Sequence, residues 1–479
     1  MKMRKILSGV MAVSIASAAL LAGCGQKEAD NSAPYEIDWY FVTGSVPGDV
    51  TKVEQAADEY LKDKLNVTLK LHYLDWGAYS TKLNVMIAGG DKFDICHTSA
   101  DTYRLNAAKN AYVPLNDLID KYAPKTKDLL GDEFLKGSQI NGQNYGLPAN
   151  KDKGHDQGML YRTDIAEELG LTEKLKEVKT LDDMYPILDI VKEKKPDMVP
   201  LMEFSLNAAS SLVNFDTVAF PIGFMPGDET LEVLNYVETP EYRDACIRSR
   251  NHRVKGYTKE GTKLSAENHF AEFCGLKAGK DKEMSGARKY DYTQISMTPA
   301  YMTNGDATGS LMAISRTCKN PERVMQFLEL FNTDTYLNNL IVYGVEGVNY
   351  TKLDDNTIDP IKNSGYGNAG MQWEFGNTFI NYVVKGEDPD KAKNMEEYNA
   401  KLIPAPSLGF SFDSEPVKTE LGACQNVQAE YVNVLANGGE ENPEAVLDEY
   451  INKLKSAGAE KIKEEVKRQL AEWKNSNNK

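Results

Sequence analysis

The sequence predicts an α/β protein whose first sheet is parallel, because strand and helix patterns alternate along its start. Residues 67–73 alternate apolar with polar side chains, and residues 35–42 begin the same way and end apolar. Helical spacing of apolar residues follows each strand, over 50–61 and 79–87, before a short third strand at 93–96. This order is typical of parallel strands joined by crossover helices.

The carboxyl ends of these strands predict a ligand site. In open α/β sheets, ligands bind in the crevice beyond those ends, where loops bring side chains from several strands together. The ends of the three strands in this chain carry hydroxyl, carboxylate and indole groups. The candidate residues are Thr43, Trp76, Thr98, Ser99 and Asp101.

Helices are predicted in the rest of the chain. Residues 161–170 and 181–194 show helical spacing. Asn320-Pro321 and Asn442-Pro443 each pair a good N-cap with a proline suited to the first helical position, and Gly458 predicts the end of the helix that starts at Pro443.

The first residues have the pattern of an export signal. Lys2, Arg4 and Lys5 precede an apolar run that closes on Leu21-Ala22-Gly23-Cys24. This ending resembles the lipobox of bacterial lipoproteins, which implies that Cys24 becomes the first mature residue and carries acyl chains. We therefore expect a signal peptide over 1–23, a tether over 24–34 and a location on the extracytoplasmic face of the bacterial membrane, with the lipid anchor as the only membrane contact.

Composition and missing motifs narrow the function. A net charge of −16 argues against nucleic acid as a partner. The five cysteines other than Cys24 are scattered, unlike a disulfide framework or a zinc site, and we expect small core residues. No Gly-x-Ser-x-Gly elbow, phosphate-binding loop or paired metal-ligand histidines occur. We expect no catalysis, no metal and no cofactor.

Aromatic and polar residues together favour a binding site for sugars. A sugar ring presents flat C–H faces, which stack on aromatic rings, and hydroxyl edges, which pair with amide or carboxylate groups. Trp76 follows the second strand, and Trp373 lies in the glycine-flanked segment Gly370-Met371-Gln372-Trp373-Glu374-Phe375-Gly376-Asn377.

Several motifs in fixed order resemble one family. They are the segment 79–91, Ile140-Asn141-Gly142-Gln143-Asn144-Tyr145-Gly146-Leu147-Pro148, Tyr161-Arg162-Thr163-Asp164 with Thr180-Leu181-Asp182-Asp183, and the C-terminal segments 344–350, 373–377, 408–410 and 415–417. In this order the chain resembles the extracellular solute-binding proteins of family 1, the sugar-binding lipoproteins of ABC importers. The C-terminal segments resemble a subgroup whose tail is a domain of unknown function.

The resemblance implies a two-lobed fold of the periplasmic-binding-protein type II (Venus flytrap) class, each lobe a mostly parallel sheet flanked by helices. Lobe one would comprise 35–149 plus 308–349, and lobe two 150–307 plus 350–479. It also implies that Tyr145, Tyr161 and Arg162 contribute to the ligand site and that Trp373 stacks on a sugar ring.

The resemblance further implies a monomeric, lipid-anchored receptor. Such a receptor captures a carbohydrate, in this case an oligosaccharide, between its lobes and delivers it to permease subunits driven by a separate ATPase. Alternatives remain open from the residues: a binder of a peptide or another small solute, a surface glycoside hydrolase, or a structural lipoprotein with a degenerate cleft.

Overall fold

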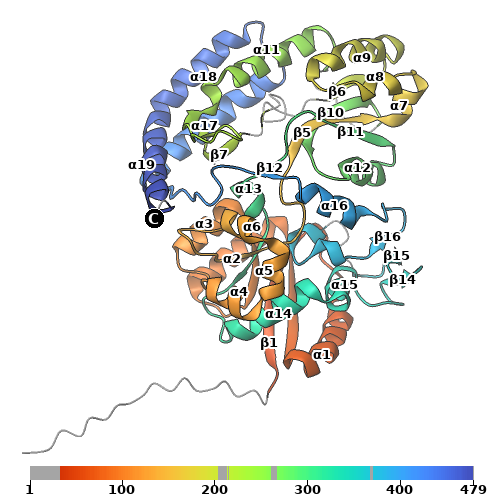
Figure 1. Ribbon diagram of the computed structural model, residues 1–479, viewed down its shortest axis with the longest axis vertical. Coiled ribbons are helices and arrows are strands. Elements are labelled where there is room, and N and C mark those ends of the chain that lie inside the picture. The colour runs from red at the N-terminus through yellow and green to blue at the C-terminus, as the bar shows by residue number, and fades with distance from the viewer. Residues whose placement is uncertain (1–32, 203–212, 214, 260–266, 367–370, 478–479) are drawn as a thin grey trace, which may run out of the picture.

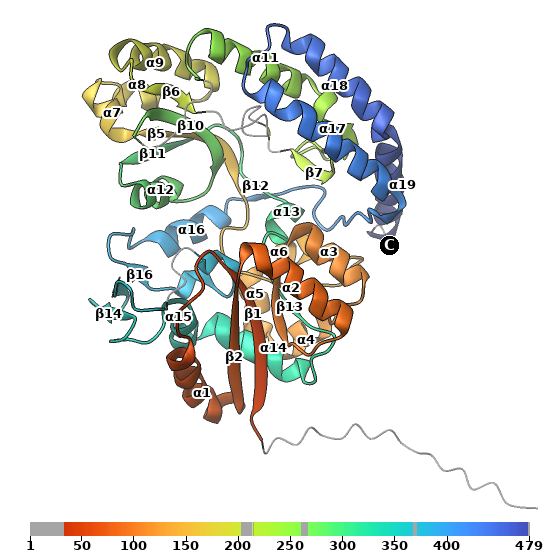
Figure 2. The same ribbon diagram turned by 180° about the vertical axis from the view of Figure 1, so that it is seen from behind.

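The computed structural model describes residues 33–202, 213, 215–259, 267–366 and 371–477. Two α/β lobes lie one above the other, with a layer of long helices beside the upper lobe (Figures 1 and 2). The predicted two-lobed α/β fold is confirmed. The expected signal peptide, Cys24 and nearly all of the tether lie outside the described residues.

The first lobe is built on a sheet with strand order β2-β1-β3-β13-β4. Alternation along β1 buries Trp39 and Phe41 in one core with Phe327 and Phe331, while Val42 packs toward the opposite face with Tyr79. The strands are β1 (Tyr35–Thr43), β2 (Val67–Asp75), β3 (Ile95–Thr98), β4 (Leu147–Pro148) and β13 (Leu311–Ile314). The helices are α1 (Thr51–Leu65), α2 (Trp76–Gly89), α3 (Ala100–Ala108), α4 (Asn116–Tyr122), α5 (Pro124–Leu130), α6 (Asp132–Gly137), α14 (Pro321–Thr333) and α15 (Thr335–Tyr343).

The second lobe has a sheet of order β11-β5-β10-β6. One face packs on α7, α8 and α9, whose apolar residues form a single core with Met159 and Phe270, and α12 joins the strands β10 and β11. The strands are β5 (Asp156–Arg162), β6 (Val199–Met202), β10 (His269–Leu276) and β11 (Tyr292–Ser296). The helices are α7 (Thr163–Glu168), α8 (Thr172–Lys176), α9 (Leu181–Lys194) and α12 (Lys280–Arg288).

Among the described strands, each of the two main sheets contains one strand that runs antiparallel to the others. In the first sheet only β13 runs against the other strands, and in the second only β5 does. Each of these two strands is the one that arrives from the opposite lobe. A chain crossing the cleft reaches a sheet at the carboxyl edge of its strands, so the entering strand must run away from the cleft. The cleft therefore lies where sequence patterns place a ligand crevice.

The chain crosses between the lobes at segments that lie side by side. β12 (Tyr301–Met302) pairs with β17 (Ile403–Pro404), and His155 bridges to Tyr301. The imidazole Nδ1 of His155 lies 2.8 Å from Oδ1 of Asp306, in α13 (Asn304–Ala307). These contacts join the segments that connect the two lobes.

A further hydrophobic core belongs to the C-terminal helices. It joins a sheet of order β7-β8-β9 to long helices, and its members include Phe224, Tyr450 and Ile462. The elements are β7 (Asp216–Ala219), β8 (Ile222–Phe224), β9 (Leu234–Asn235), η1 (Tyr236–Glu238), α11 (Pro240–Val254), η4 (Glu415–Val417), α17 (Lys418–Ala436), α18 (Pro443–Ala457) and α19 (Ala459–Asn477).

One expected lobe boundary is corrected. The expectation placed all of 350–479 in lobe two, yet residues 350–384 pack on the first lobe. The Phe375 ring lies 5.8 Å from that of Trp39, and the Tyr382 ring 6.5 Å from that of Tyr343, so burial of these rings fixes the segment there. The elements are β14 (Tyr350–Lys352), β15 (Thr357–Pro360), η2 (Gln372–Glu374), η3 (Thr378–Ile380) and β16 (Val383–Val384), followed by α16 (Lys391–Asn399).

Two further expectations concern the surface and the thiols. Within the described residues no helix has both the length and the apolar character that crossing a membrane requires. The described cysteines are unpaired, and four of them, Cys96, Cys246, Cys318 and Cys424, are buried as predicted, while Cys274 is half-buried.

Candidate functional site

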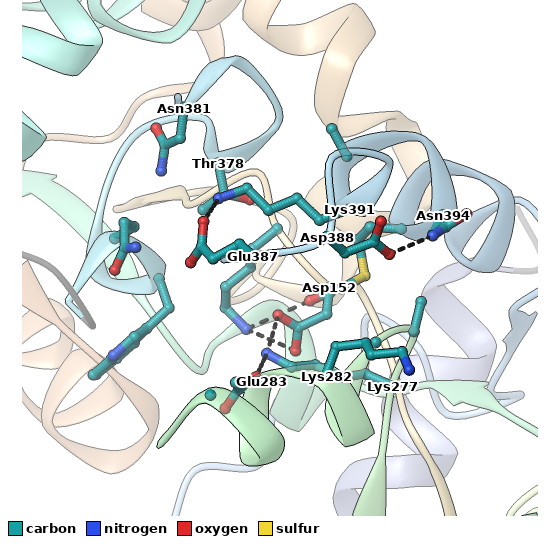
Figure 3. Close-up of a pocket in the computed structure, with 18 of the residues that line it drawn as sticks. Asp152, Lys277, Lys282, Glu283, Thr378, Asn381, Glu387, Asp388, Lys391 and Asn394 are labelled. Carbon is teal, nitrogen blue, oxygen red and sulfur yellow. Dashed lines mark hydrogen bonds and ion pairs between the residues drawn. The ribbon is translucent and has the colours of Figure 1, made fainter. Parts of the chain in front are cut away.

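A cavity of about 830 Å³ lies between the lobes (Figure 3). Lobe two contributes α12 and the turn before it, and the opposite wall comes from η2, η3 and the loop into α16. Lys151 and Asp152, from a segment that crosses between the lobes, also line it. Groups from both lobes therefore face one space, as a ligand held by closure requires.

The wall on the side of lobe one is aromatic. Trp373 and Phe379 line the cavity, and the indole of Trp373 is nearly parallel to that of Trp76, with 6.1 Å between centroids and 11° between planes. The ring of His97 meets Trp373 edge-on at 6.2 Å. Trp76 is 54% exposed. Stiff planar rings at a cleft offer the flat apolar surface on which a sugar face stacks.

The hydrophobic core fixes the position of Trp373. Phe375, two residues on, packs edge-on against the rings of Trp39 and Phe41, at ring distances of 5.8 and 5.0 Å. Gly376 has a φ of +74°, and a Cβ there would lie 2.5 Å from the Phe331 ring, so the turn requires glycine. The sequence Trp-Glu-Phe-Gly thus places one aromatic ring in the core and the other at the cleft.

Polar groups supplement the aromatic wall. Asn381 is 7% exposed and lines the cavity, and its Oδ1 has no hydrogen-bond partner. Asp388 accepts from Nδ2 of Asn394 at 2.9 Å and forms no ion pair with a described residue. A buried acceptor such as the Asn381 oxygen costs free energy of folding unless a ligand hydroxyl or a water molecule donates a hydrogen bond to it.

The wall from lobe two is held by ion pairs. The Lys277 ammonium lies 3.5 Å from Asp152 and 3.2 Å from Glu283 (Figure 3). Lys280 lies 2.9 Å from Glu283. Burial opposes the charged form of Lys277, but the two carboxylates outweigh burial and hold its pKa above the ordinary value. Burial likewise opposes ionisation of Glu283, yet the lysines hold its pKa below the ordinary value.

The surface of α12 in the cavity carries small residues beside the charged Lys282 and Glu283. Gly279, Gly286 and Ala287 line it, and no residue of α12 is buried. A Cβ built on Gly286 would meet nothing within 4 Å. This wall therefore presents open space and small residues opposite the aromatic rings.

The structure brings the two predicted tryptophans together. Trp76 and Trp373, 297 positions apart in the sequence, stack beside the cavity. Thr43 and Thr98 are buried nearby at the ends of β1 and β3. Their hydroxyls are engaged locally, with the Ser45 backbone and with the Tyr112 hydroxyl at 3.3 Å.

The other predicted residues of lobe one are spread along its cleft edge or lie deeper. Ser99 is the N-cap residue of α3, and its side chain makes no capping bond. Asp101 lies in the first turn of α3, and its side chain is outside what the structure describes. Tyr145 is half-buried, with its N–H donating to the Tyr103 hydroxyl at 2.9 Å. None of these three lines the cavity, and their roles stay predictions.

Tyr161 and Arg162 lie away from the cavity, which differs from the expectation. They end strand β5 and point to opposite faces of it. Tyr161 is 6% exposed in the core of lobe two, beside Phe270. The Arg162 guanidinium donates to both Asp164 oxygens, at 2.7 and 2.6 Å, and stacks on Tyr290. Helical spacing suggested that 161–170 was one helix, but β5 ends at Arg162 and α7 begins only at Thr163.

Sequence patterns missed the polar half of the site. Asp152, Lys277 and Asn381 lie in a crossing segment, a turn and irregular chain, where periodicity carries no information. Glu283 lies in α12, a charged helix with no buried residue and so no apolar stripe to mark it. Glu374 was visible as the neighbour of Trp373, although nothing in the pattern marked it as buried. No cluster of His, Cys, Asp or Glu in the described residues is arranged to hold a metal ion.

Comparison with known proteins gives two family matches and several relatives. The family described as "Bacterial extracellular solute-binding protein" matches residues 44–223, and "Domain of unknown function (DUF3502)" matches residues 406–475. The chain is similar to a "Carbohydrate ABC transporter substrate-binding protein" of Streptococcus pneumoniae serotype 4, with 28% identity over 97% of this chain and 96% of that protein. "Lipoprotein LipO" of Bacillus subtilis is 27% identical over 39% of this chain and 36% of its own length.

Among solved structures, the chain resembles the N-glycan transport solute binding protein NgtS of Streptococcus pneumoniae. One NgtS structure matches with a TM-score of 0.78 and 25% identity, over 91% of this chain and 98% of that one. NgtS in complex with Man1GlcNAc matches with a TM-score of 0.70 and 26% identity, over 91% of this chain and 99% of that one. These matches confirm the family resemblance drawn from the motifs.

Proposed function

We propose that this chain, which belongs to the bacterial extracellular solute-binding proteins, captures an oligosaccharide between its lobes and delivers it to an ABC permease. The observation that carries the proposal is the aromatic wall of the interlobe cavity. Its volume of about 830 Å³ falls within the roughly 300–1,000 Å³ of small-molecule sites. Trp373 and Phe379 offer stacking surface, and Asn381 offers an unpartnered acceptor beside them.

The relatives support a carbohydrate as the ligand. The pneumococcal relative is named a carbohydrate transporter component, and NgtS was solved with Man1GlcNAc and with Man5GlcNAc. The cavity combines flat apolar surface with hydrogen-bonding groups on both walls, which suits a polyhydroxylated ring better than a purely apolar or purely ionic solute.

The charges of the cavity favour binding over hydrolysis. A glycosidase needs one carboxyl that stays protonated near neutral pH as general acid. Lysines instead pair with the carboxylates of Asp152, Glu283 and Glu387, and they hold the pKa of Glu283 below its ordinary value. We propose that the chain is a receptor and not an enzyme.

Ligand-driven closure would couple capture to delivery. A ligand touching both walls favours the closed arrangement by its extra affinity for that state, and shifting the equilibrium from 1:99 to 99:1 takes about 5.5 kcal/mol. One stacked ring and a few cross-cleft hydrogen bonds are of that order. The crossing segments around β12 and β17 would serve as the hinge.

Partners and location complete the proposal. The permease subunits would recognise the closed, monomeric receptor, and a separate ATPase would drive release. A lipid on Cys24 would hold the receptor at the extracytoplasmic face of the membrane, where the tether 24–34 keeps it close to the permease and raises its effective concentration there. The likeness to a lipoprotein supports the anchor.

The test is calorimetry on the protein without its signal and anchor. The titrants are a panel of oligosaccharides that includes Man1GlcNAc and Man5GlcNAc, a set of short peptides, and monosaccharides. We expect binding of at least one oligosaccharide, a rise in melting temperature with that ligand, and no new reducing ends after incubation. Binding of peptides alone would contradict the carbohydrate proposal, and released reducing ends would contradict the receptor proposal.

A further inference from the structure

We propose that Glu374 is a positioning residue whose uncharged carboxyl holds the turn that presents Trp373 to the ligand. The inference rests on the proposed function, because it assigns Glu374 a role through the stacking residue of the sugar site. Glu374 does not line the cavity, so it would act through its neighbour.

Glu374 ties the η2 turn to the central strands of lobe one. Its Oε1 accepts a hydrogen bond of 2.8 Å from the backbone N–H of Val42, near the end of β1. Its backbone carbonyl accepts a 2.5 Å bond from the Ser310 hydroxyl, beside β13. Trp373 immediately precedes these two attachments, and Phe375 immediately follows them. The side chain of Glu374 therefore fixes the end of the turn from which the indole projects.

The environment of the Glu374 carboxyl disfavours a charge. The residue is 1% exposed, and its Oε2 has no hydrogen-bond partner. No described cation forms an ion pair with it. Burial raises its pKa well above the ordinary value, against the smaller opposing effect of the Val42 N–H. An ionised carboxylate here would be a buried charge without a partner. Opening of the turn would expose that charge to water and so remove its free-energy cost.

The titratable groups around this turn stay uncharged near neutral pH. From α2, Tyr79 donates to the His97 carbonyl at 2.7 Å, and burial raises its pKa. From β3, burial lowers the pKa of His97 to about 4 and raises that of Cys96 to about 12. Glu374 is thus the acid in this cluster whose ionisation would add a charge beneath Trp373.

The sign of the pH effect follows from linkage. An unfolded glutamate ionises near pH ~4.3, whereas folded Glu374 keeps its proton to higher pH. The folded state then binds more protons than the unfolded state, so this group removes stability as pH rises above that value. Glutamine cannot ionise. Glu374→Gln should therefore gain stability over the natural protein progressively from about pH 4 upward.

The experiment first reads the position of Trp373 without any ligand. The protein is labelled with 5-fluorotryptophan, and the ¹⁹F resonance of Trp373 is assigned by its loss in Trp373→Phe. We expect Glu374→Gln to keep the resonance. Glu374→Ala should shift or broaden it, and so should Ser310→Ala, which removes the second attachment while leaving the carboxyl intact. Glu54 is the matched control, because its carboxylate also accepts a strand N–H, from Leu71 at 2.9 Å, but pairs with Lys70.

Two further readouts complete the test. Affinity for the bound oligosaccharide should fall about tenfold or more in Glu374→Ala and stay within about twofold in Glu374→Gln. The difference in melting temperature between Glu374→Gln and the natural protein should widen between pH 4 and pH 7. An unchanged Trp373 resonance in Glu374→Ala would overturn the inference, as would a pH-independent melting difference. If no oligosaccharide binds, the proposed function fails while the resonance and melting data still decide the role of Glu374.

Discussion

The two walls of the interlobe cavity are built in opposite ways. The wall on lobe one carries Trp373 on a turn anchored by the core, with Phe375 packed among Trp39 and Phe41. The wall on lobe two is α12, which buries none of its residues and is held through lysine–carboxylate pairs. One wall is fixed by packing and the other by charge.

This difference suggests a division of labour during binding. A rigid aromatic surface loses little entropy when a ring stacks on it, so the first wall is suited to supply affinity. The second wall offers space, small residues and exposed charge, and it is suited to close over whatever the first wall holds. We therefore expect large effects from filling the space or removing the ring, and small effects from trimming exposed groups.

Filling the cavity from α12 should have the largest effect. Gly286→Trp places an indole where a Cβ meets no atom within 4 Å, so the helix tolerates it while the ligand space is occupied. We expect a loss of oligosaccharide affinity of about hundredfold or more, on the order of 2.8 kcal/mol.

Gly422→Trp is the matched control for this variant. Gly422 is also a helical glycine whose added Cβ meets nothing within 4 Å, but it lies in α17 and does not line the cavity. Calorimetry should find its affinity unchanged. Equal affinities of the two tryptophan variants would place the ligand outside this cavity.

Removing the central cation should loosen the second wall without unfolding the first. In Lys277→Met, Asp152 and Glu283 lose a shared partner that lies 3.5 and 3.2 Å away. Because the Lys277 side chain is 27% exposed, we expect a loss of about 1–2 kcal/mol in the free energy of unfolding, between surface and fully buried pairs. Denaturant unfolding measures it, with Lys176→Met, from the exposed pair with Glu173, as control. If the free energy of unfolding changes no more in Lys277→Met than in Lys176→Met, the ionic network does not support α12.

Trimming the outer indole should have the smallest effect. Trp76 is 54% exposed and stacks on Trp373 without lining the cavity. Trp76→Ala should lower affinity about threefold, within the ~0.5–1.5 kcal/mol of one aromatic contact. An effect as large as that of removing Trp373 would show that the two indoles bind the ligand as a pair, and the division between inner and outer ring would then be wrong.

Much of the fold was predictable because its strands and helices carry clear periods. β1, β2 and β3 and the helices between them follow from alternation and helical spacing, and Asn320 and Asn442 do cap α14 and α18. The pairing of β5 was hidden, because a strand that enters from the other lobe leaves no directional mark in its sequence. The assignment of 350–384 to lobe one was hidden for a similar reason, since burial of Phe375 and Tyr382 depends on tertiary packing.

The site was predictable only in its aromatic half. Trp76 was predicted from its position after a strand, and Trp373 from its glycine-flanked segment. In the structure the two indole rings stack. Resemblance alone suggested Tyr161 and Arg162, but alternation along β5 turns one into the lobe-two core and the other toward Asp164 and Tyr290. The lysine–carboxylate wall comes from a crossing segment, a turn and α12, and only the folded chain brings its members together.

The central claim is that a sugar ring stacks on Trp373 in the cleft. The most direct measurement is the calorimetric affinity of Trp373→Ala for an oligosaccharide that binds the natural protein, with Trp473→Ala as control. Trp473 lies in α19 and packs on Phe410, away from the cavity. We predict a loss of about tenfold or more, at least ~1.4 kcal/mol, for Trp373→Ala and no change for Trp473→Ala. Unchanged affinity in a cooperatively folded Trp373→Ala would contradict the claim.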